Sequence, residues 1–475
     1  MNKYYPRIID KEIEKYLDDK DAILIIGPKW CGKTTSAKQQ AKSIIKLESN
    51  QKEYYYQIAE FNPQKLLDGD KPRLIDEWQV IPMIWDIVHN NLDNLGTMGN
   101  YILTGSTVVN EGEIQHSGAG RIHRMLMMPM SLYESRESNG SISLKDLFHN
   151  PDLNIDGITS DLSFEELIFA MCRGGWPIIT TKNKRKSKLR VAKSYIDVIC
   201  NSDISRVDGV KRDSNIAKQI LKSYARNIST LATDKTILKD MTANFRSIDE
   251  KTYYRYLEAF KKIFLIYNVE SWTPNIRSAS AMRKTHKREF IDPSIAVASL
   301  NLSPEKLLND FETLGFIFET LCVRDLRVYS TSLDGVVRYY NDKYGLEADC
   351  VLELDDGNYA LIEFKLGMRE IDKGAKNLLK LKSIIIDKKE KGETHIPEPS
   401  FLAVITGSGF AYTRKDGVKV IPIACLKDWK IIPSFIFDSS SYNVYILLIK
   451  SIKIFNRLLS VTICLHYLSI GSTFL

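Results

Sequence analysis

Residues 21–45 read DAILIIGPKWCGKTTSAKQQAKSII, and this stretch decides the fold of the first part of the chain. An apolar, β-branched run at 22–26 breaks at Gly27 and Pro28, and helical composition begins at Lys33. This order predicts a buried strand, a tight loop and a helix. The loop GPKWCGKT fits the spacing G-x-x-x-x-G-K-[ST], in which backbone N–H groups and the positive end of the helix face a phosphate. The sequence therefore predicts a nucleotide phosphate site.

The chemistry of such a site gives the loop residues different tasks. Gly27 and Gly32 let the backbone curl, Lys33 can reach the β- and γ-phosphates, and the Thr34 hydroxyl can ligate Mg²⁺. A glycine-rich turn that matches the spacing by chance is the alternative, and the strand–loop–helix order argues against it. The predicted nucleotide-binding residues of the loop are Gly27, Pro28, Lys29, Trp30, Cys31, Gly32, Lys33, Thr34 and Thr35.

The composition is that of an ordinary soluble protein with room for several domains. The chain has 475 residues, 44% hydrophobic and 26% charged, enough for two to four cores. A net charge of +7 permits a polyanionic partner without requiring one. The seven cysteines form no C-x-x-C pair, which argues against a zinc site or a disulfide framework and for a reducing compartment. Since the first residues also lack a signal-peptide core, the predicted location is cytoplasmic.

Two carboxylates follow the next short apolar run. PRLIDEWQ at 72–79 places Asp76 and Glu77 at the end of a predicted strand. In phosphate-loop enzymes this is the expected second half of the site: Asp76 would hold Mg²⁺ through water, and Glu77 would polarise the attacking water. A helix N-terminal cap is the structural alternative for such a pair. The phosphate loop upstream favours the catalytic interpretation.

The neighbouring segments add further candidates. Residues 53–58 look like a second strand, 83–92 like a helix, and 99–106 like an apolar strand that ends in hydroxyls. Strand ends of a parallel sheet lie on its ligand-facing edge, so Thr104 or Ser106 could sense the γ-phosphate; a plain polar turn is the alternative. Downstream, Arg121 could stabilise charge on the transferred phosphoryl group, in its own or a neighbouring subunit, or it could be a surface arginine.

Taken in order, these motifs resemble a known family. GPKWCGKT, LIDEWQ, YILTGS and GAGR, followed by PMSL, are similar to motifs of prokaryotic AAA-type ATP-binding proteins, over residues 1 to about 435. The resemblance implies an N-terminal ATPase domain that uses ATP and Mg²⁺, followed by a C-terminal region described mainly as a domain of unknown function. The opening Tyr5-Pro6-Arg7 looks like the family's first segment, which would lie near the nucleotide. A second copy of the chain, forming a homo-oligomer, is a candidate partner.

A helical region follows. Seven basic residues and no acid lie within 182–193, as either a solvated face or a contact to a nucleic-acid backbone. Two helices within 237–263 and a strand at 264–269 indicate a winged helix that binds DNA or, alternatively, a protein. The residues predicted to face a DNA groove are Lys251, Thr252, Tyr253 and Arg255. The nearby basic residues that favour nucleic acid are Arg277, Arg283, Lys284, Lys287 and Arg288.

The segment from 312 to 405 resembles the PD-(D/E)xK nuclease fold in its order of helix, three strands, helix and strand. Asp349 lies on one predicted strand, and alternation puts Glu363 and Lys365 on one face of the next. Two carboxylates could share Mg²⁺ while the ammonium orients water or steadies phosphate charge, and Glu319 on the helix could complete the metal shell. The alternative is a nuclease-like fold whose charged strand ends are merely solvated.

The final segment differs from the rest. Residues 458–475 contain no Lys, Arg, Asp or Glu over 18 positions, which is the lower limit for a membrane span. An extra packing segment, or a tail unrelated to the parent fold, is favoured over a tail anchor, so no membrane contact is expected.

The predicted fold class is therefore α/β: an AAA-type P-loop parallel-sheet domain at 1–180, a helical and winged-helix segment at 181–295, a restriction-endonuclease-like domain at 296–435 and an apolar tail at 436–475. The predicted function is ATP binding and Mg²⁺-dependent ATP hydrolysis, coupled to DNA binding or cleavage. The alternative is a nucleotide-switched DNA- or protein-binding regulator whose nuclease-like domain is inactive.

Overall fold

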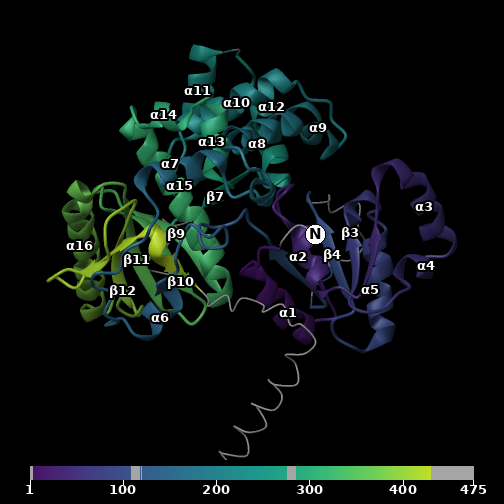
Figure 1. Cartoon of the computed structure of the whole chain (residues 1–475), viewed down its shortest axis with the longest axis horizontal. Coiled ribbons are helices and arrows are strands. Elements are labelled where there is room, and N and C mark those ends of the chain that lie inside the picture. Colours follow the sequence, from purple (N-terminus) through teal and green to yellow (C-terminus); the bar gives the residue numbers. More distant parts are fainter. Residues whose placement is uncertain (1–3, 108–117, 119, 246, 275–284, 429–475) are drawn as a thin grey trace, which may run out of the picture. The chain divides into compact units, whose positions relative to one another are not determined.

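The computed structural model describes residues 4–107, 118, 120–245, 247–274 and 285–428, and Figure 1 shows their helices and strands. These residues belong to one compact unit. The predicted tail at 436–475, and with it the question of a tail anchor, lies outside the described residues. Within the described ranges, no helix has both the length and the apolar character that crossing a membrane requires.

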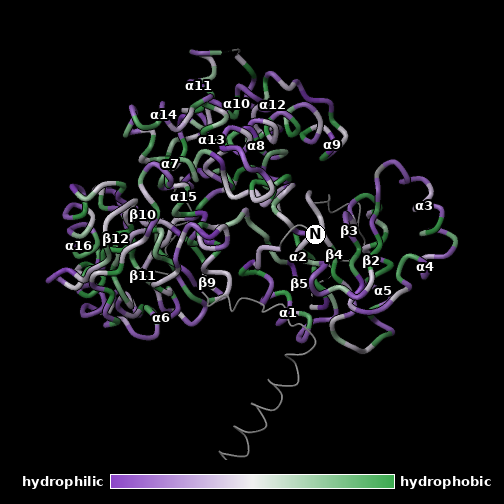
Figure 2. Tube along the Cα trace, in the orientation of Figure 1, coloured by the Kyte–Doolittle hydropathy of each residue, from purple (hydrophilic) through white to green (hydrophobic). Residues whose placement is uncertain are grey.

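Five parallel strands form the first sheet, in the spatial order β2-β3-β4-β1-β5. β1 lies between β4 and β5: its Leu24 is opposite Leu103 on one side and Arg124 on the other. β1, β3 and β4 are short buried runs, as expected for a parallel sheet that is covered on both faces. Figure 2 colours the Cα trace by hydropathy, with hydrophobic residues in green. The bounds are β1 Ala22–Ile26, β2 Ser43–Lys46, β3 Arg73–Asp76, β4 Tyr101–Gly105 and β5 Ile122–Leu126.

Helices cover both faces of this sheet. On one face, Ile13 and Ala37 pack against Ile23. On the other face, Trp85 and Leu92 pack with Leu24. The bounds are α1 Ile9–Asp19, α2 Lys33–Gln40, α3 Lys52–Phe61, α4 Gln64–Leu67 and α5 Ile84–Leu95. The structure confirms five predicted elements: the strand at 22–26, the helix from Lys33, the helix over 83–92 and the strands that end at Asp76 and Gly105.

The predicted strand at 53–58 is wrong, because these residues lie in helix α3. Three successive tyrosines gave this segment the composition of a strand. As a helix, it exposes Tyr54 and packs Tyr55 and Tyr56 against the core. The second strand is instead β2, an edge strand with alternating half-buried and exposed residues that follows the loop helix directly.

A helical region connects the two sheets. Ser163 caps α7 and Asp213 caps α10, each by accepting hydrogen bonds from N–H groups of the first turn. The bounds are β6 Ile142–Ser143, α6 Leu144–His149, α7 Phe164–Arg173, α8 Arg185–Val198, a π-helix η5 Ile199–Asp203, α9 Ile204–Arg206, α10 Ser214–Arg226, α11 Asp234–Asn244, α12 Glu250–Lys262, α13 Pro293–Ser299 and α14 Pro304–Leu307.

Helices α11 and α12 are followed by an antiparallel pair, β7 Ile266–Val269 and β8 Lys287–Phe290. The order of elements agrees with the predicted segment, but three predicted nucleic-acid contacts are wrong. Tyr253 is buried and its hydroxyl donates to Asp234. Lys287 and Arg288 are also buried, each in an ion pair. Of the other basic residues in that predicted patch, Arg277, Arg283 and Lys284 lie outside the described residues.

The second sheet has six strands in the order β13-β14-β12-β11-β10-β9. β9, β10 and β11 pair antiparallel, and β11, β12 and β14 pair parallel. Leu378 and Leu381 of α16 pack on one face with Val351 and Leu361. The bounds are α15 Phe311–Ser330, β9 Gly335–Asn341, β10 Glu347–Leu354, β11 Tyr359–Lys365, α16 Ile371–Glu390, β12 Phe401–Thr406, β13 Tyr412–Thr413, β14 Lys419–Pro422 and β15 Leu426–Lys427.

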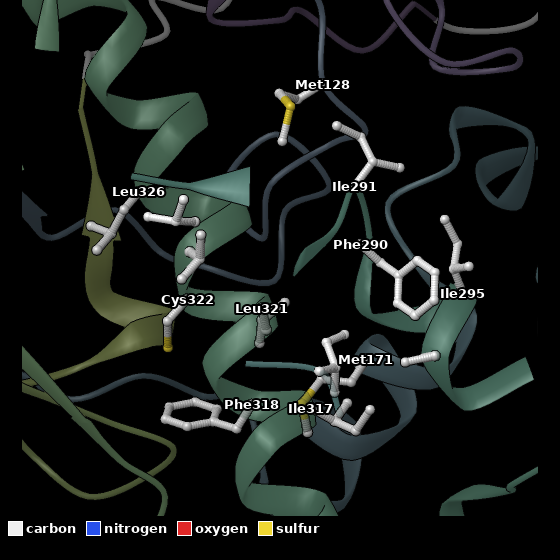
Figure 3. Close-up of a cluster of buried hydrophobic side chains, with 14 of the residues drawn as sticks. Met128, Met171, Phe290, Ile291, Ile295, Ile317, Phe318, Leu321, Cys322 and Leu326 are labelled. Atoms are coloured by element: carbon white, nitrogen blue, oxygen red, sulfur yellow. The ribbon is translucent and has the colours of Figure 1, made fainter. Parts of the chain in front are cut away.

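The opposite face of this sheet belongs to the largest hydrophobic core. Phe318 and Cys322 of α15 are buried in the same cluster as Cys350 and Ile362 of the sheet. Figure 3 shows side chains of α15 in this cluster together with Phe290 and Ile295 from the helical region. Helix α15 therefore packs against both the helical region and the second sheet.

Candidate functional site

The loop between β1 and α2 needs its two glycines for steric reasons. Gly27 and Gly32 both have positive φ, at 148° and 108°, where a side chain would strain the backbone. A Cβ on Gly27 would also collide with the carbonyl oxygen of Met127. The sequence Gly-x-x-x-x-Gly therefore fixes the path of the loop.

Lys33 is buried at the start of α2 and points back into the loop. Its Nζ donates to the carbonyl oxygens of Gly27 at 2.9 Å and Pro28 at 2.8 Å. The ammonium group therefore lies inside the turn where the phosphates are expected. A phosphate that enters the loop would replace these carbonyls as the hydrogen-bond acceptor of Lys33.

The carboxyl ends of β3 and β4 bring Asp76 and Thr104 beside the loop. The two residues lie opposite each other in the parallel register. Asp76 Oδ1 accepts from Thr34 Oγ1 at 2.7 Å and from Thr104 Oγ1 at 2.5 Å. The predicted residues of the loop, the acidic strand and the hydroxyl strand are thus in one hydrogen-bonded group. Hydroxyl and carboxylate oxygens are the donors that Mg²⁺ prefers, so this set fits that ion.

Glu77 follows Asp76 in a left-handed backbone conformation, with φ of 59°. Such a conformation is uncommon for a residue other than glycine and often marks a functional position. The Glu77 N–H donates to Thr104 Oγ1 at 3.3 Å, and its carboxylate accepts from Ser106 Oγ at 3.1 Å and from Gln79. Gln79 was missed in the sequence; its position two residues after the acidic pair was the available signal.

A cavity of about 1250 Å³ lies over the loop. The first domain contributes Lys33, Thr34, Thr35, Glu77 and Ser106 to its wall. The helical region contributes Pro177, Ile178, Lys182, Arg190, Val191 and Arg206 to the wall. Two residues of the basic run at 182–193 therefore face this cavity, which sequence reasoning did not anticipate.

Lys29 and Trp30 connect the loop to the helical wall. Lys29 Nζ lies 2.7 Å from Oδ1 of the buried Asp203 in η5. Trp30 is 43% exposed, lines the cavity and makes an edge contact with the ring of Tyr195. Of the remaining predicted loop residues, Cys31 is buried in the hydrophobic core beneath the loop.

Arg7 binds the backbone of the loop and of the segment after β5. Its Nη1 donates to the carbonyl oxygen of Cys31 at 2.7 Å and its Nη2 to that of Met128 at 2.8 Å. Its Nε is 3.0 Å from Glu134 Oε1. The opening Tyr5-Pro6-Arg7 therefore lies next to the phosphate loop, and its arginine supports the backbone of the loop.

Arg121 is not placed at this site. It precedes β5, and the parallel pairing of Ala22 with Ile122 puts it at the sheet edge opposite the loop. Its guanidinium group pairs with Asp21 at 3.2 Å and Asp93 at 2.8 Å. The prediction that Arg121 reaches the phosphates of its own chain is therefore wrong; a role toward a neighbouring subunit stays a prediction.

A second polar cluster lies at the second sheet. Lys365 Nζ is 2.5 Å from Glu363 Oε2 and 3.3 Å from Asp349 Oδ2. Asp349 also accepts from the Phe364 N–H at 2.8 Å, and Glu363 accepts from Asn377 Nδ2 at 3.3 Å. The structure thus brings together the three residues that the sequence singled out on these strands.

The electrostatics of this cluster differ at its two carboxylates. Burial would raise the pKa of Asp349, but the ammonium groups of Lys287 and Lys365 outweigh it and hold the pKa below its usual value. Burial, together with the charge of Asp349, raises the pKa of Glu363 to about 8, against the opposing effect of Lys365.

Glu319 lies at the same cluster but pairs with a different cation. Its Oε1 contacts Nζ of Lys287 from β8, and that Nζ is 3.9 Å from Asp349 Oδ1. Among the described residues, no group of three or more His, Cys, Asp or Glu side chains is arranged to hold a metal ion. The predicted metal ligands Glu319, Asp349 and Glu363 are instead each paired with a lysine.

Fold and site together define the class of the first domain: an α/β P-loop domain of AAA-type ATPases. Residues 19–135 match a family model described as an AAA domain. Residues 164–306 and 314–426 match two further family models, each described as a domain of unknown function, DUF8612 and DUF4143. The ATPase class thus describes the first part of the chain, and the matched families assign no function to the rest.

Solved structures give weaker likenesses. A Walker-type ATPase of Pyrococcus abyssi is 15% identical over 62% of this chain and 96% of that chain, with a TM-score of 0.38. A DNA polymerase III gamma subunit-related protein from Thermotoga maritima is 10% identical over 66% of this chain and 100% of that chain, with a TM-score of 0.21. A comparison with curated proteins gives no match.

Proposed function

We propose that this chain binds ATP in the cavity over the loop and hydrolyses it in a Mg²⁺-dependent reaction. One observation carries the proposal: Thr34, Asp76 and Thr104 share hydrogen bonds directly beside a phosphate loop whose lysine already lies within the turn. If Asp76 only capped a helix, hydroxyls from two other elements would not need to meet on one of its carboxylate oxygens.

The residues divide the work of hydrolysis between them. The loop N–H groups and Lys33 bind the phosphates, and Glu77 takes the position of the base that polarises the attacking water. Gln79 and Ser106 hold the Glu77 carboxylate in place. Mg²⁺, held by Thr34 and through water by Asp76, would supply positive charge beside the β- and γ-phosphates.

The helical wall takes the remaining contacts with the nucleotide. Arg190 and Arg206 bring positive charge to the cavity from the helical region. Trp30 of the loop adds an exposed ring to the same cavity. The nucleoside would therefore lie between the loop and α8, with the phosphates toward Lys33.

Calorimetric titration of Mg·ATP into the full chain tests the proposal. Lys33→Ala should weaken binding about 100-fold, since two charge-assisted hydrogen bonds worth about 1.5 kcal/mol each are lost. Glu77→Gln should keep binding but lower the hydrolysis rate by about 10²- to 10⁴-fold. Lys38→Ala, which removes an exposed lysine from the same helix, is the control and should change neither. Unchanged affinity in Lys33→Ala would overturn the assignment.

We also propose a cytoplasmic location and the division of the chain at about residues 180, 295 and 435. All six cysteines of the described ranges are buried and unpaired, as expected in a reducing compartment.

A second candidate function follows from α11, α12 and the β7–β8 pair: a nucleotide-switched module that binds DNA or a protein. The exposed Lys251 and Arg255 on α12 are suited to phosphate contacts. Gel-shift titration of duplex DNA with and without Mg·ATP tests this candidate. A shift that responds to nucleotide and is weakened by Lys251→Ala would support DNA binding. If no shift occurs under either condition, the module does not bind DNA, and a protein remains the candidate partner.

A further inference from the structure

We propose that Lys287 is an internal counter-ion that takes the place of a divalent metal between Glu319 and Asp349, so that the C-terminal cluster binds no such metal. The inference rests on the ion pairs of this cluster alone. It is independent of the proposed ATPase function.

The position of Lys287 is fixed by its strand. It lies at the end of β8, opposite Val269 of β7, and its side chain is 9% exposed. From there its ammonium group contacts Glu319 on α15 and lies 3.9 Å from Asp349 Oδ1 on β10. The cation therefore occupies the space between the two carboxylates that a bridging metal would need.

A second ammonium group closes the other side of Asp349. Lys365 Nζ lies between Asp349 Oδ2 and Glu363 Oε2, at 3.3 Å and 2.5 Å. Both oxygens of Asp349 thus face a lysine. A divalent ion that ligated Asp349 would have to displace one of these ammonium groups and would be repelled by the other at short range in a poorly solvated site.

Two of the three carboxylate charges of the cluster are already balanced by ammonium groups in this arrangement. Three carboxylates share two ammonium groups, and Asn377 and the Phe364 N–H add neutral donors. An oxygen-ligated divalent ion is normally held by carboxylates, carbonyls and water rather than beside fixed cations. The cluster therefore fits an ion-pair junction that ties β8 and α15 to the sheet better than it fits a metal-dependent catalytic centre.

Binding of Mn²⁺ to the full chain without nucleotide, followed by the electron paramagnetic resonance signal of free Mn²⁺, tests the inference. Wild type and Asp349→Asn should bind the same number of Mn²⁺ ions, because Asp349 ligates none. Lys287→Met should bind one additional Mn²⁺ per chain, and the double variant Lys287→Met/Asp349→Asn should lose it. Lys419→Met removes a similarly buried lysine from β14 of the second sheet and should add none.

Two results would overturn the inference. One is Mn²⁺ binding by wild type that Asp349→Asn or Glu319→Gln abolishes. The other is a Lys287→Met variant with a native circular dichroism spectrum and no additional ion. If Lys287→Met does not fold, the comparison of wild type with Glu319→Gln still decides, since the inference requires equal binding in these two proteins.

Discussion

Two threonines reach one oxygen of Asp76, and this contact shows how single residues prepare the nucleotide site. Thr34 comes from the loop helix and Thr104 from the neighbouring strand, and both donate to Oδ1. A hydroxyl that donates to a carboxylate keeps its lone pairs free to accept or to ligate a cation. The oxygen ligands are therefore already positioned in the folded protein, so binding of a cation does not have to order them.

The buried carboxyl of Glu289 should give the protein a pH-dependent stability. Burial raises its pKa from 4.5 to about 7, although Lys287 and the hydroxyls of Thr320 and Ser229 oppose the shift. The folded state then binds more protons than the unfolded state between these two values, so the free energy of unfolding falls as pH rises through this range. Glu289→Gln should be the more stable protein at pH 8, by at most about 3 kcal/mol.

Denaturant unfolding at pH 5 and pH 8 measures this difference. The loss of stability from pH 5 to pH 8 should be smaller in Glu289→Gln than in wild type. Glu312→Gln, an exposed glutamate at the start of α15, should show the wild-type loss. An equal loss in Glu289→Gln would mean that Glu289 is ionised in the folded protein throughout this range.

At the scale of elements, α8 and η5 form the wall that faces the loop. A π-helical turn within a helix is uncommon and often lies at a functional site. Here η5 presents the buried Asp203 to Lys29 of the loop. Two elements that are far apart in the chain thereby meet through a charged pair at the edge of the nucleotide cavity.

Arg190 of α8 should contribute to nucleotide binding through its charge. It lines the cavity but is exposed, so solvent screening limits its effect to about 0.5–1 kcal/mol. Arg190→Ala should therefore weaken Mg·ATP binding by about two- to fivefold, and less in high salt. Arg185→Ala is the matched control, because Arg185 lies on the same helix and pairs with Glu166 outside the cavity. Equal effects of the two variants would contradict the assignment.

The elements also show what the sequence could and could not predict. The strand before Gly27 and the acidic strand end at Asp76 are local patterns, and a short window is enough to recognise them. Arg121 was misplaced because its position depends on the register between β1 and β5. Lys287 was assigned to a surface patch because its partners, Glu319 and Asp349, lie 32 or more residues away in the chain.

At the scale of the whole described unit, buried polar contacts connect the first domain to α15. Glu134 accepts from the Ile8 N–H and pairs with Arg7. Nearby, the Leu132 N–H donates to Asp325 of α15 at 3.0 Å. Arg324 then pairs with Asp325 at 2.6 Å and with Asp292 at 2.9 Å. The first domain therefore packs against the rest of the unit through satisfied charges as well as apolar side chains.

Replacing Arg324, the cation that pairs with both Asp292 and Asp325, should lower the free energy of unfolding. Arg324→Met leaves Asp292 and Asp325 buried without their partner and should lower the free energy of unfolding by about 3–5 kcal/mol. Arg414→Met removes pairs with the more exposed Asp372 and Asp416 and should cost less than about 1 kcal/mol. Chemical denaturation of both variants gives the comparison, and a small loss in Arg324→Met would show that water reaches the two aspartates.

The short pairing of β6 with β15 joins Ile142 to Leu426, and Ser138 Oγ and the Asn139 N–H donate to carbonyls of the same late segment. During synthesis on the ribosome, the partners of the backbone at 138–143 are made almost three hundred residues later. These hydrogen bonds therefore cannot form until the late segment has emerged. A nascent chain that stalls before residue 424 would carry an open edge at this point, where chaperones or proteases could act.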